Sequence, residues 1–144
     1  MTGEEHYRKL ERLYASGPIN EFYRPTLEVR EGAAKLVIPI RSELHHAAHA
    51  VHGAVYFKAL DDACWFAAAS LLEDALVLTA SFNIHLLRPV SEGKLIAEGR
   101  VVHTSQRLFI AEGVLENDEG QVLARGGGTF MRTDTPLSPE IGYV

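Results

Sequence analysis

A 19-residue stretch, Ala54–Leu72, carries only three charged residues, which are Lys58, Asp61 and Asp62. The stretch is long enough to cross a lipid bilayer as a helix. Three charges on adjacent turns near its centre would make insertion costly, so we predict a buried helix and no membrane span. Since an apolar helix has to be surrounded by other elements, the stretch also predicts that the rest of the chain wraps around it.

Most of the remaining chain has the patterns of short strands. The segment Glu4–Ala15 has apolar residues at helical spacing and predicts a short amphipathic helix. In the segment Val77–Leu87, strict alternation puts Leu78 and Phe82 on one face and Thr79 on the other. The predicted strands are Thr26–Arg30, Lys35–Ile40, Val77–Leu87, Lys94–His103, Arg107–Leu115 and Gln121–Arg132.

These elements are expected to form one sheet, because consecutive antiparallel strands need only short turns. The predicted fold class is α+β, with an antiparallel β-sheet of five to six strands wrapped around one long central α-helix and a short N-terminal helix. One domain is expected over residues 1–144, with a helical extension at 1–22 and an irregular tail at 133–144. A sheet of this size leaves an edge to cover, which favours a homodimer.

The composition argues against several classes of protein. A hydrophobic content of 47% with 23% charged residues indicates a folded domain rather than a disordered chain. The formal net charge of -5 disfavours non-specific binding to nucleic acid. Cys64 is the only cysteine, and the charged first ten residues do not resemble a signal peptide, so a cytoplasmic location is expected.

The two adjacent aspartates of the apolar stretch have different surroundings. Neighbouring residues on a helix point about 100° apart, so Asp61 and Asp62 cannot share one face. Asp62 lies four residues after Lys58 and can form a surface ion pair with it. Asp61 lies on the apolar stripe with Trp65 and has no cation within reach on the helix. We therefore expect Asp61 either to accept a buried hydrogen bond from another element or to take part in chemistry.

Four histidines precede the predicted helix, namely His45, His46, His49 and His52. Imidazoles at this spacing can converge on a metal, although no cysteine joins them and the HExxH motif is absent, so a metal site and a plain loop cluster are the weaker alternatives. The favoured interpretation places His52-Gly53 at the helix N-terminus, where free N–H groups and the helix dipole stabilise negative charge. These two residues form a candidate oxyanion hole, with Asp61 two turns further along the helix.

The residues around this helix N-terminus resemble the hotdog-fold thioesterase superfamily, specifically its acyl-CoA thioesterases of the phenylacetate-pathway type. Members show an Asn, a Gly three residues later, then His-Gly-Gly, and an acidic residue nine positions after that His. Here His52 and Asp61 have the nine-residue separation, and Gly53 matches the first Gly of the pair. The similarity covers roughly residues 34–132 and includes Ser81–Ile84, Leu87–Val90, Lys94–Val102, Ala124–Gly126 and Gly128–Phe130.

The resemblance implies an enzyme that hydrolyses acyl-CoA to a free acid and coenzyme A without a metal or redox cofactor. It assigns Asp61 as general base or nucleophile and the Gly53 N–H as the group that polarises the thioester carbonyl. Family sites are built across a dimer interface, so Asp61 is expected to face His52 of the partner subunit, in a homodimer or in a homotetramer of two dimers. Thr79 matches a Ser or Thr that positions water or the carboxylate in related enzymes.

Three positions depart from the family pattern. His46 stands in place of the Asn, His49 in place of the Gly before the His, and Ala54 in place of the second Gly. His46 can replace Asn as a hydrogen-bond donor, whereas His49 and Ala54 add bulk beside the thioester. These residues are expected to affect substrate choice, and Trp65 is a candidate for the lining of an acyl pocket.

Coenzyme A carries phosphates, so an acidic chain has to attract it with local cations. Arg88 at a strand end, Arg107 at a turn and Arg125 before the glycine run 126–128 are the candidates. The glycine run lacks the Lys-Ser/Thr of a phosphate loop and instead predicts close packing within a strand.

Two other functions remain compatible with these residues. One is a non-catalytic protein that binds acyl-CoA or a lipid-like ligand, which the departures at His46, His49 and Ala54 favour. The other is a hotdog enoyl hydratase or dehydratase, because such enzymes also use a His with an acidic residue. The sequence determines neither which acyl group the substrate has nor whether the thioester is carried by coenzyme A or by an acyl carrier protein.

Overall fold

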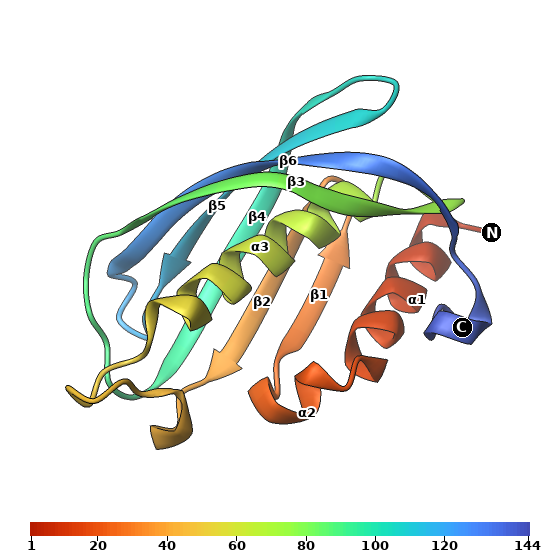
Figure 1. Cartoon of the computed structure of the whole chain (residues 1–144). Helices are drawn as coiled ribbons and strands as arrows, with labels where there is room; N and C mark the ends of the chain where they lie inside the picture. Colours follow the sequence, from red (N-terminus) through yellow and green to blue (C-terminus); the bar gives the residue numbers. More distant parts are fainter.

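The apolar stretch forms a long helix, α3 (Gly53–Ala69), which lies against the concave face of one antiparallel sheet (Figure 1). In this computed structural model, which describes residues 1–144, the six strands have the order β1-β2-β4-β5-β6-β3. The predicted α+β fold, with a sheet wrapped around one central helix, is confirmed. The strands are β1 (Thr26–Arg30), β2 (Ala33–Pro39), β3 (Ala75–Leu86), β4 (Lys94–Thr104), β5 (Leu108–Glu116) and β6 (Val122–Pro136).

Small residues on both sides allow α3 to lie close to the sheet. Ala59 and Ala63 of the helix are completely buried. A Cβ atom at Gly99 of β4 would lie 2.7 Å from the carbonyl carbon of Ala63, and one at Gly113 of β5 would lie 3.0 Å from Leu60 Cδ2. A side chain at Gly99 would collide with the helix backbone and push α3 outward, whereas one at Gly113 would crowd the side chains of Leu60 and Cys64, so Gly99 is the position that limits how deeply α3 is seated.

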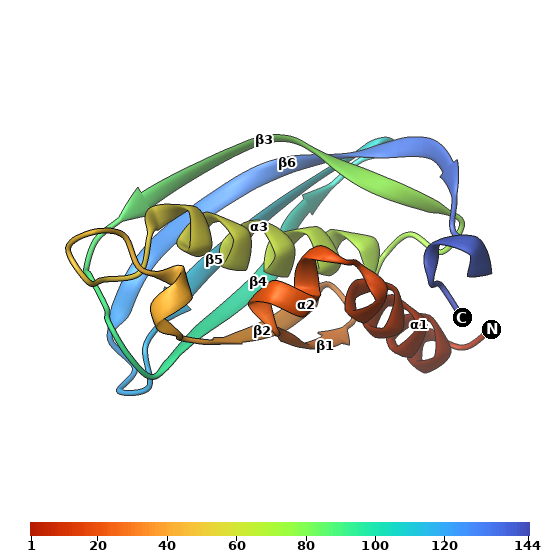
Figure 2. The same ribbon diagram turned by 60° about the horizontal axis from the view of Figure 1, so that its bottom comes forward.

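Two N-terminal helices, α1 (Gly3–Ser16) and α2 (Ile19–Tyr23), lie beside α3 on the side of β1 (Figure 2). The buried His6 fixes α1 to the end of α3, since its Nε2 lies 2.9 Å from the carbonyl oxygen of Ala69. Its Nδ1 lies 2.7 Å from the hydroxyl of Tyr143. Because a carbonyl can only accept, Nε2 donates its proton and Nδ1 accepts from the tyrosine.

The C-terminal tail is more regular than expected. Strand β6 continues to Pro136, which pairs with Ala75 of β3, and a short 3-10 turn follows at Pro139–Ile141. Tyr143 near the end of the chain is 7% exposed. The prediction of an irregular segment over 133–144 is therefore wrong for 133–136 and 139–141, while the other residues of the segment have no helix or strand. The order of 133–136 and of Tyr143 could not be predicted locally, because their partners on β3 and α1 come from distant parts of the chain.

Strand β3 contains a β-bulge at Ala80. Thr79 and Ser81 pair with consecutive residues of β6, so Ala80 has no residue opposite it. The extra residue shifts the alternation, so that Thr79 and Phe82 both face α3 while Leu78 points outward and is 61% exposed. The predicted uniform alternation, which put Thr79 on the face opposite to Phe82, is therefore wrong.

Strand β3 also forms one edge of the sheet, since only β6 pairs with it. Its 12 residues leave one row of backbone groups unpaired, and the exposed Leu86 and Leu87 lie at its end. All three α-helices lie on the concave side, so the convex face carries no helix (Figures 1 and 2). None of the helices, α3 included, combines the length and the hydropathy that a membrane-spanning helix needs.

The substitution Gly99→Ala is expected to lower the free energy of unfolding by about 1–3 kcal/mol, because the added methyl group would collide with the backbone of α3. Gly17→Ala is the matched control, since a Cβ atom there would meet nothing closer than 3.5 Å. Urea denaturation of both variants measures the difference. A Gly99 variant as stable as the control would contradict the close seating of α3.

Candidate active site

Asp61 lies on the flank of α3 that faces β3. The hydroxyl of Thr79 donates to Asp61 Oδ1 at 2.9 Å, and the bulge is what turns Thr79 toward the helix. The other oxygen, Oδ2, accepts no hydrogen bond from the chain and keeps contact with solvent. Burial raises the pKa of this carboxyl, and the hydrogen bond from Thr79 opposes part of that rise. Asp61 is thus a partly desolvated carboxylate with one fixed and one free oxygen.

Asp62 lies on another flank of α3 and has its own partners. Lys58 Nζ is 2.8 Å from its Oδ2, and the hydroxyl of Tyr14 donates to the same oxygen at 2.6 Å. The predicted ion pair is confirmed, but it is not a surface pair, because Lys58 and Asp62 are only 12% and 19% exposed. The two adjacent acids therefore differ as expected, and Asp61 is the one without a cation.

His52 is the N-cap residue of α3. Its Nδ1 accepts from the Ala54 N–H at 2.9 Å, and its carbonyl oxygen accepts from the Val55 N–H at 2.9 Å. The neutral imidazole therefore carries its proton on Nε2. None of these capping hydrogen bonds uses the Gly53 N–H, which stays free at the positive end of the helix dipole. A Cβ atom at Gly53 would lie 3.0 Å from Leu86 Cδ1, so the end of β3 packs against this helix start.

One chain does not bring the oxyanion donor and the acid together. Gly53 and Asp61 are eight residues apart on one helix, which corresponds to about 12 Å along its axis. A base and an oxyanion donor each have to lie within about 3 Å of the atoms on which they act. The two groups of a single chain therefore cannot serve the same carbonyl group.

Three of the histidines before α3, His45, His46 and His49, lie in a tight loop that is closed by a bridge between His45 and Val51. His46 Nδ1 accepts from a backbone N–H of the loop at 3.1 Å, and its ring lies 6.5 Å from the ring of His52. His49 has a φ of 64°, in the left-handed region that favours glycine, which fits the family's glycine at this position. No three His, Cys, Asp or Glu side chains come together as a metal site.

An aromatic pair lies next to Asp61. Phe57, one turn earlier on α3, contacts Phe82 of β3 with ring centroids 5.3 Å apart. Cβ atoms at Gly126 and Gly128 of β6 would lie 2.8 and 2.6 Å from the Phe82 ring, so the glycine run makes room for that ring. The predicted close packing at the glycines is confirmed. The place of Phe82 beside the site did not follow from the sequence, although glycines at alternate positions of a strand, here Gly128 opposite Phe82 and Gly126 opposite Ile84, are a usable signal for a large ring on the neighbouring strand.

Ala54 and Trp65, the two residues of α3 that were expected to contact the substrate, lie at either end of this flank of the helix. Ala54 occupies the first turn, where its N–H is capped by His52. Trp65, one turn beyond Asp61, packs against Phe66 with ring centroids 4.6 Å apart. The side chain of Ala54 is exposed and that of Trp65 is half-buried, so each keeps a surface that another molecule can contact.

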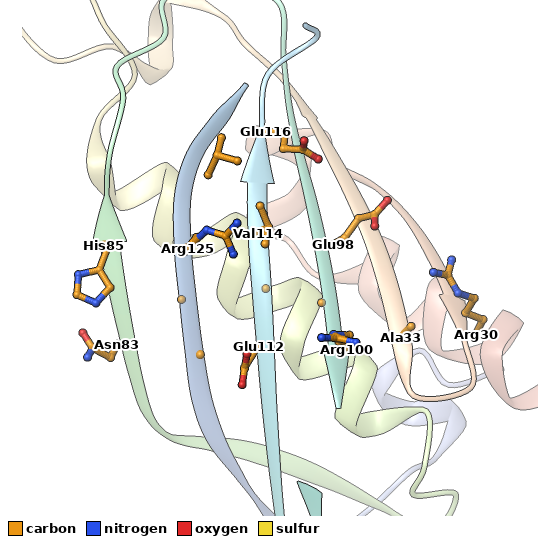
Figure 3. Close-up of a pocket in the computed structure, with 15 residues that line it drawn as sticks. Arg30, Ala33, Asn83, His85, Glu98, Arg100, Glu112, Val114, Glu116 and Arg125 are labelled. Atoms are coloured by element: carbon orange, nitrogen blue, oxygen red, sulfur yellow. The ribbon is translucent and has the colours of Figure 1, made fainter. Parts of the chain in front are cut away.

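The three candidate arginines do not form one cluster. The carbonyl oxygen of Arg88 accepts from the hydroxyl of Tyr56 at 2.7 Å, which places this residue beside the first turns of α3. Arg125 lines a groove of about 780 Å³ on the convex face of the sheet, with α3 behind it (Figure 3). Arg107 lies in the turn before β5 and bonds through its carbonyl oxygen to Arg132. Seven residues of β6 separate that point from Arg125, which is about 23 Å.

Comparison with known proteins places this arrangement in a family. Residues 48–124 match the family described as the thioesterase superfamily, and this segment contains Gly53, Asp61 and Thr79. A protein of Archaeoglobus fulgidus, named as a candidate esterase, is 30% identical over 114 residues, which are 78% of this chain and 73% of that protein.

Solved structures share the fold. The PaaI protein from the phenylacetic acid degradation operon of E. coli superposes with a TM-score of 0.86 at 16% identity, over 96% of this chain and 100% of that one. A thioesterase of Haemophilus influenzae gives a TM-score of 0.78 at 17% identity, over 88% of this chain and 90% of that one. The chain has the hotdog fold and, by the match over residues 48–124, belongs to the thioesterase superfamily.

Proposed function

We propose that the protein hydrolyses acyl-CoA thioesters to a free carboxylic acid and coenzyme A. The observation that carries this proposal is Asp61, a partly desolvated carboxylate that Thr79 holds by one oxygen and that is open at the other. The free Gly53 N–H at the start of α3 adds a donor for an oxyanion. The family match and the esterase and thioesterase names of the relatives agree with this type of reaction.

In the proposed reaction, Asp61 Oδ2 takes a proton from a water molecule as the water oxygen attacks the thioester carbonyl carbon. The carbonyl oxygen becomes an oxyanion, which accepts from the Gly53 N–H and is stabilised by the helix dipole. Collapse of the tetrahedral intermediate breaks the C–S bond, and Asp61 returns its proton to the leaving thiolate. If Asp61 attacks the carbonyl carbon directly, the same oxygen and the same donor are used, and water then hydrolyses the acyl-enzyme.

A second copy of the chain completes the site in this proposal. Gly53 and Asp61 are about 12 Å apart along one α3 helix, so the donor has to come from another molecule. The unpaired edge of β3, with Leu86 55% and Leu87 58% exposed, is suited to pairing with the same edge of a second copy. Such a pair has twofold symmetry and contains two equivalent sites.

The residues of β3 indicate the register of this pairing. We place the twofold axis at Asn83, which then lies opposite the partner's Asn83 in an antiparallel pair. If the bulged Ala80 is not counted, Thr79 and Leu86 are both three places from Asn83, so Thr79 lies opposite the partner's Leu86. Thr79 holds Asp61, and Leu86 packs against the start of α3. This register therefore brings Asp61 next to the start of the partner's α3.

The surroundings of the proposed site suit the parts of an acyl-CoA. The aromatic pair of Phe57 and Phe82 offers apolar surface for the acyl group beside Asp61. His46 lies close to the N-cap residue, where it can contact the thioester end of the substrate. Among the arginines, Arg88 lies beside the first turns of α3 and is the one we assign to the coenzyme A phosphates.

Replacing Asp61 with Asn is expected to reduce kcat/KM for a thioester by roughly 10²- to 10⁴-fold, because the amide cannot accept the proton of water. Thr79→Ala should cause a smaller loss, since it frees the carboxylate without removing it. Thiol release from a panel of acyl-CoA esters measures both variants. Undiminished hydrolysis by the Asp61 variant would refute the mechanism, and saturable binding without thiol release by the wild type would identify a non-catalytic binder.

Stability measurements on the same Asp61→Asn variant separate loss of chemistry from loss of fold. Because burial raises the pKa of Asp61, the folded protein holds this proton more tightly than the unfolded chain does. Ionisation of Asp61 therefore destabilises the fold as the pH rises from the usual aspartate range through the raised pKa. The variant should have a Tm equal to or above that of the wild type at neutral pH, and this advantage should disappear in acid. Calorimetry over a pH series would contradict the raised pKa if the variant were less stable at neutral pH.

Replacing Gly53 with Pro is expected to lower kcat by roughly 10²- to 10³-fold, because it removes the N–H that serves the oxyanion. Proline is well tolerated at the first position of a helix, and the extended conformation of His52 suits a following proline. Gly53→Ala is the matched control, since it adds a Cβ atom near Leu86 but keeps the N–H. Equal activity of the two variants would rule out the Gly53 N–H as the donor.

Mixing the two inactive variants tests whether the site is shared between subunits. Refolding Asp61→Asn with Gly53→Pro should restore about a quarter of the wild-type activity, since half of the dimers are mixed and each mixed dimer has one intact site. Each variant refolded alone is the control. If the mixture stays as inactive as its components while cross-linking detects mixed dimers, the two groups do not act across the interface.

A further inference from the structure

The flank of α3 next to Asp61 carries a closed polar network that the proposed reaction does not use. Asp62 Oδ2 accepts from Lys58 Nζ at 2.8 Å and from the hydroxyl of Tyr14 at 2.6 Å. The Lys58 ammonium also lies over two aromatic rings, 5.4 Å from the centroid of Tyr14 and 4.9 Å from that of Tyr23. One carboxylate, one ammonium and two tyrosines thus form a single group.

The network joins α3 to both N-terminal helices. Tyr14 belongs to α1, and its ring also packs edge-on against Phe66 of α3 with centroids 4.9 Å apart. Tyr23 belongs to α2. Burial and the charge of Asp62 raise the pKa of Tyr14 far above its usual range, so its proton stays in place as a donor. An ion pair this well enclosed keeps its geometry better than an exposed pair does.

The network lies within electrostatic reach of the proposed base. Asp62 is the next residue to Asp61, and its negative charge acts to raise the pKa of Asp61, whereas Lys58 acts to lower it. These two effects are smaller than those of burial and of the hydrogen bond from Thr79. Because the Lys58–Asp62 pair is compact, its opposite charges largely cancel at Asp61 as long as both are held together.

We propose that Tyr14, Lys58 and Asp62 form a positioning network, through which the N-terminal helices fix the charge beside Asp61 and thereby tune proton transfer in the reaction. This inference rests on the proposed role of Asp61. The network touches neither substrate nor reacting atoms, and it acts by keeping the ammonium and the second carboxylate together. Without the N-terminal helices, the pair would face water and separate more easily.

Lys58 and Asp62 are the charged neighbours of Asp61 on α3, because the other side chains that touch this region stay neutral. Burial raises the pKa of the Cys64 thiol to about 12, so this neighbour stays neutral. From β3, Thr79 presents a hydroxyl that does not titrate in the working range. The titratable groups next to Asp61 are Lys58, Asp62 and Cys64 of α3, Tyr14 of α1 and, in the proposed dimer, the partner's His52. Tyr23 of α2 contacts Lys58, and Glu112 of β5 lines the groove on the convex face, with the sheet between it and α3 (Figure 3).

Opposite shifts of the pH profile test this proposal in the full-length enzyme. In Lys58→Met the charge of Asp62 is left without its cation, so the acid limb of the kcat/KM profile should move to higher pH by roughly half a unit. In Asp62→Asn the ammonium is left alone, so the limb should move to lower pH by a similar amount. The double variant should return close to the wild-type profile, which a purely structural role would not produce.

A matched control uses another lysine above a tyrosine ring. Lys9 Nζ lies 5.2 Å from the centroid of Tyr143, at a distance from the site, so Lys9→Met removes the same charge and the same type of contact. Its acid limb should coincide with that of the wild type. Tyr14→Phe, which keeps the ring and removes only the hydroxyl, should move the limb upward by less than Lys58→Met does.

A second readout does not depend on activity. The pKa of Asp61 can be followed by carbon-detected NMR of the side-chain carboxyl, with Asp61→Asn used for assignment, and it should shift in the same directions in the two charge variants. Coincident titrations in wild type, Lys58→Met and Asp62→Asn would overturn the network proposal, even if Asp61→Asn is inactive. Full activity of Asp61→Asn would instead refute the proposed function, while the NMR shifts would still report on the electrostatic coupling.

Discussion

The close seating of α3 in the curved sheet determines where every candidate group of this protein lies. Gly99 of β4 lies against the backbone of α3 at the buried Ala63, and Gly113 of β5 lies against the side chains of Leu60 and Cys64, so helix and sheet approach more closely than larger side chains would allow. A helix packed so densely cannot rotate without opening voids or creating overlaps. Its flanks are therefore presented to fixed neighbours, and the step of about 100° between successive residues sends Asp61 toward β3 and Asp62 toward the N-terminal helices.

Strand β3 connects this helix to the proposed chemistry. The one extra residue at Ala80 turns Thr79 inward, where it fixes one oxygen of Asp61, and it leaves Leu78 exposed on the outer face. The same strand is the edge of the sheet, so its other side has no partner within the chain. A bulge beside a functional group on an edge strand is a frequent arrangement, because it can redirect one side chain without disturbing the rest of the sheet.

The two aspartates show how the chain completes one polar site and leaves the other incomplete. Asp62 is bound by Lys58 and by Tyr14 of α1, and Tyr23 of α2 contacts Lys58 in turn, so the environment of Asp62 is provided entirely within one molecule. Asp61 has one hydrogen bond and one free oxygen, and its nearest oxyanion donor on the same helix is out of reach. In the proposed dimer, the second copy places polar groups opposite the free oxygen of Asp61, just as the N-terminal helices place a hydroxyl group opposite Asp62.

Local patterns in the sequence were sufficient for the types and order of the main elements, and helical periodicity alone separated Asp61 from Asp62. The bulge could not be predicted, because apolar residues continue to alternate through Leu78, Ala80 and Phe82 as if the strand were regular. The bond between Tyr14 and Asp62 spans 48 residues, and no local pattern relates them. A local sequence pattern determines which face of one element is apolar. Register, bulges and contacts between distant residues depend on how the elements pack against one another, so only the tertiary structure decided them.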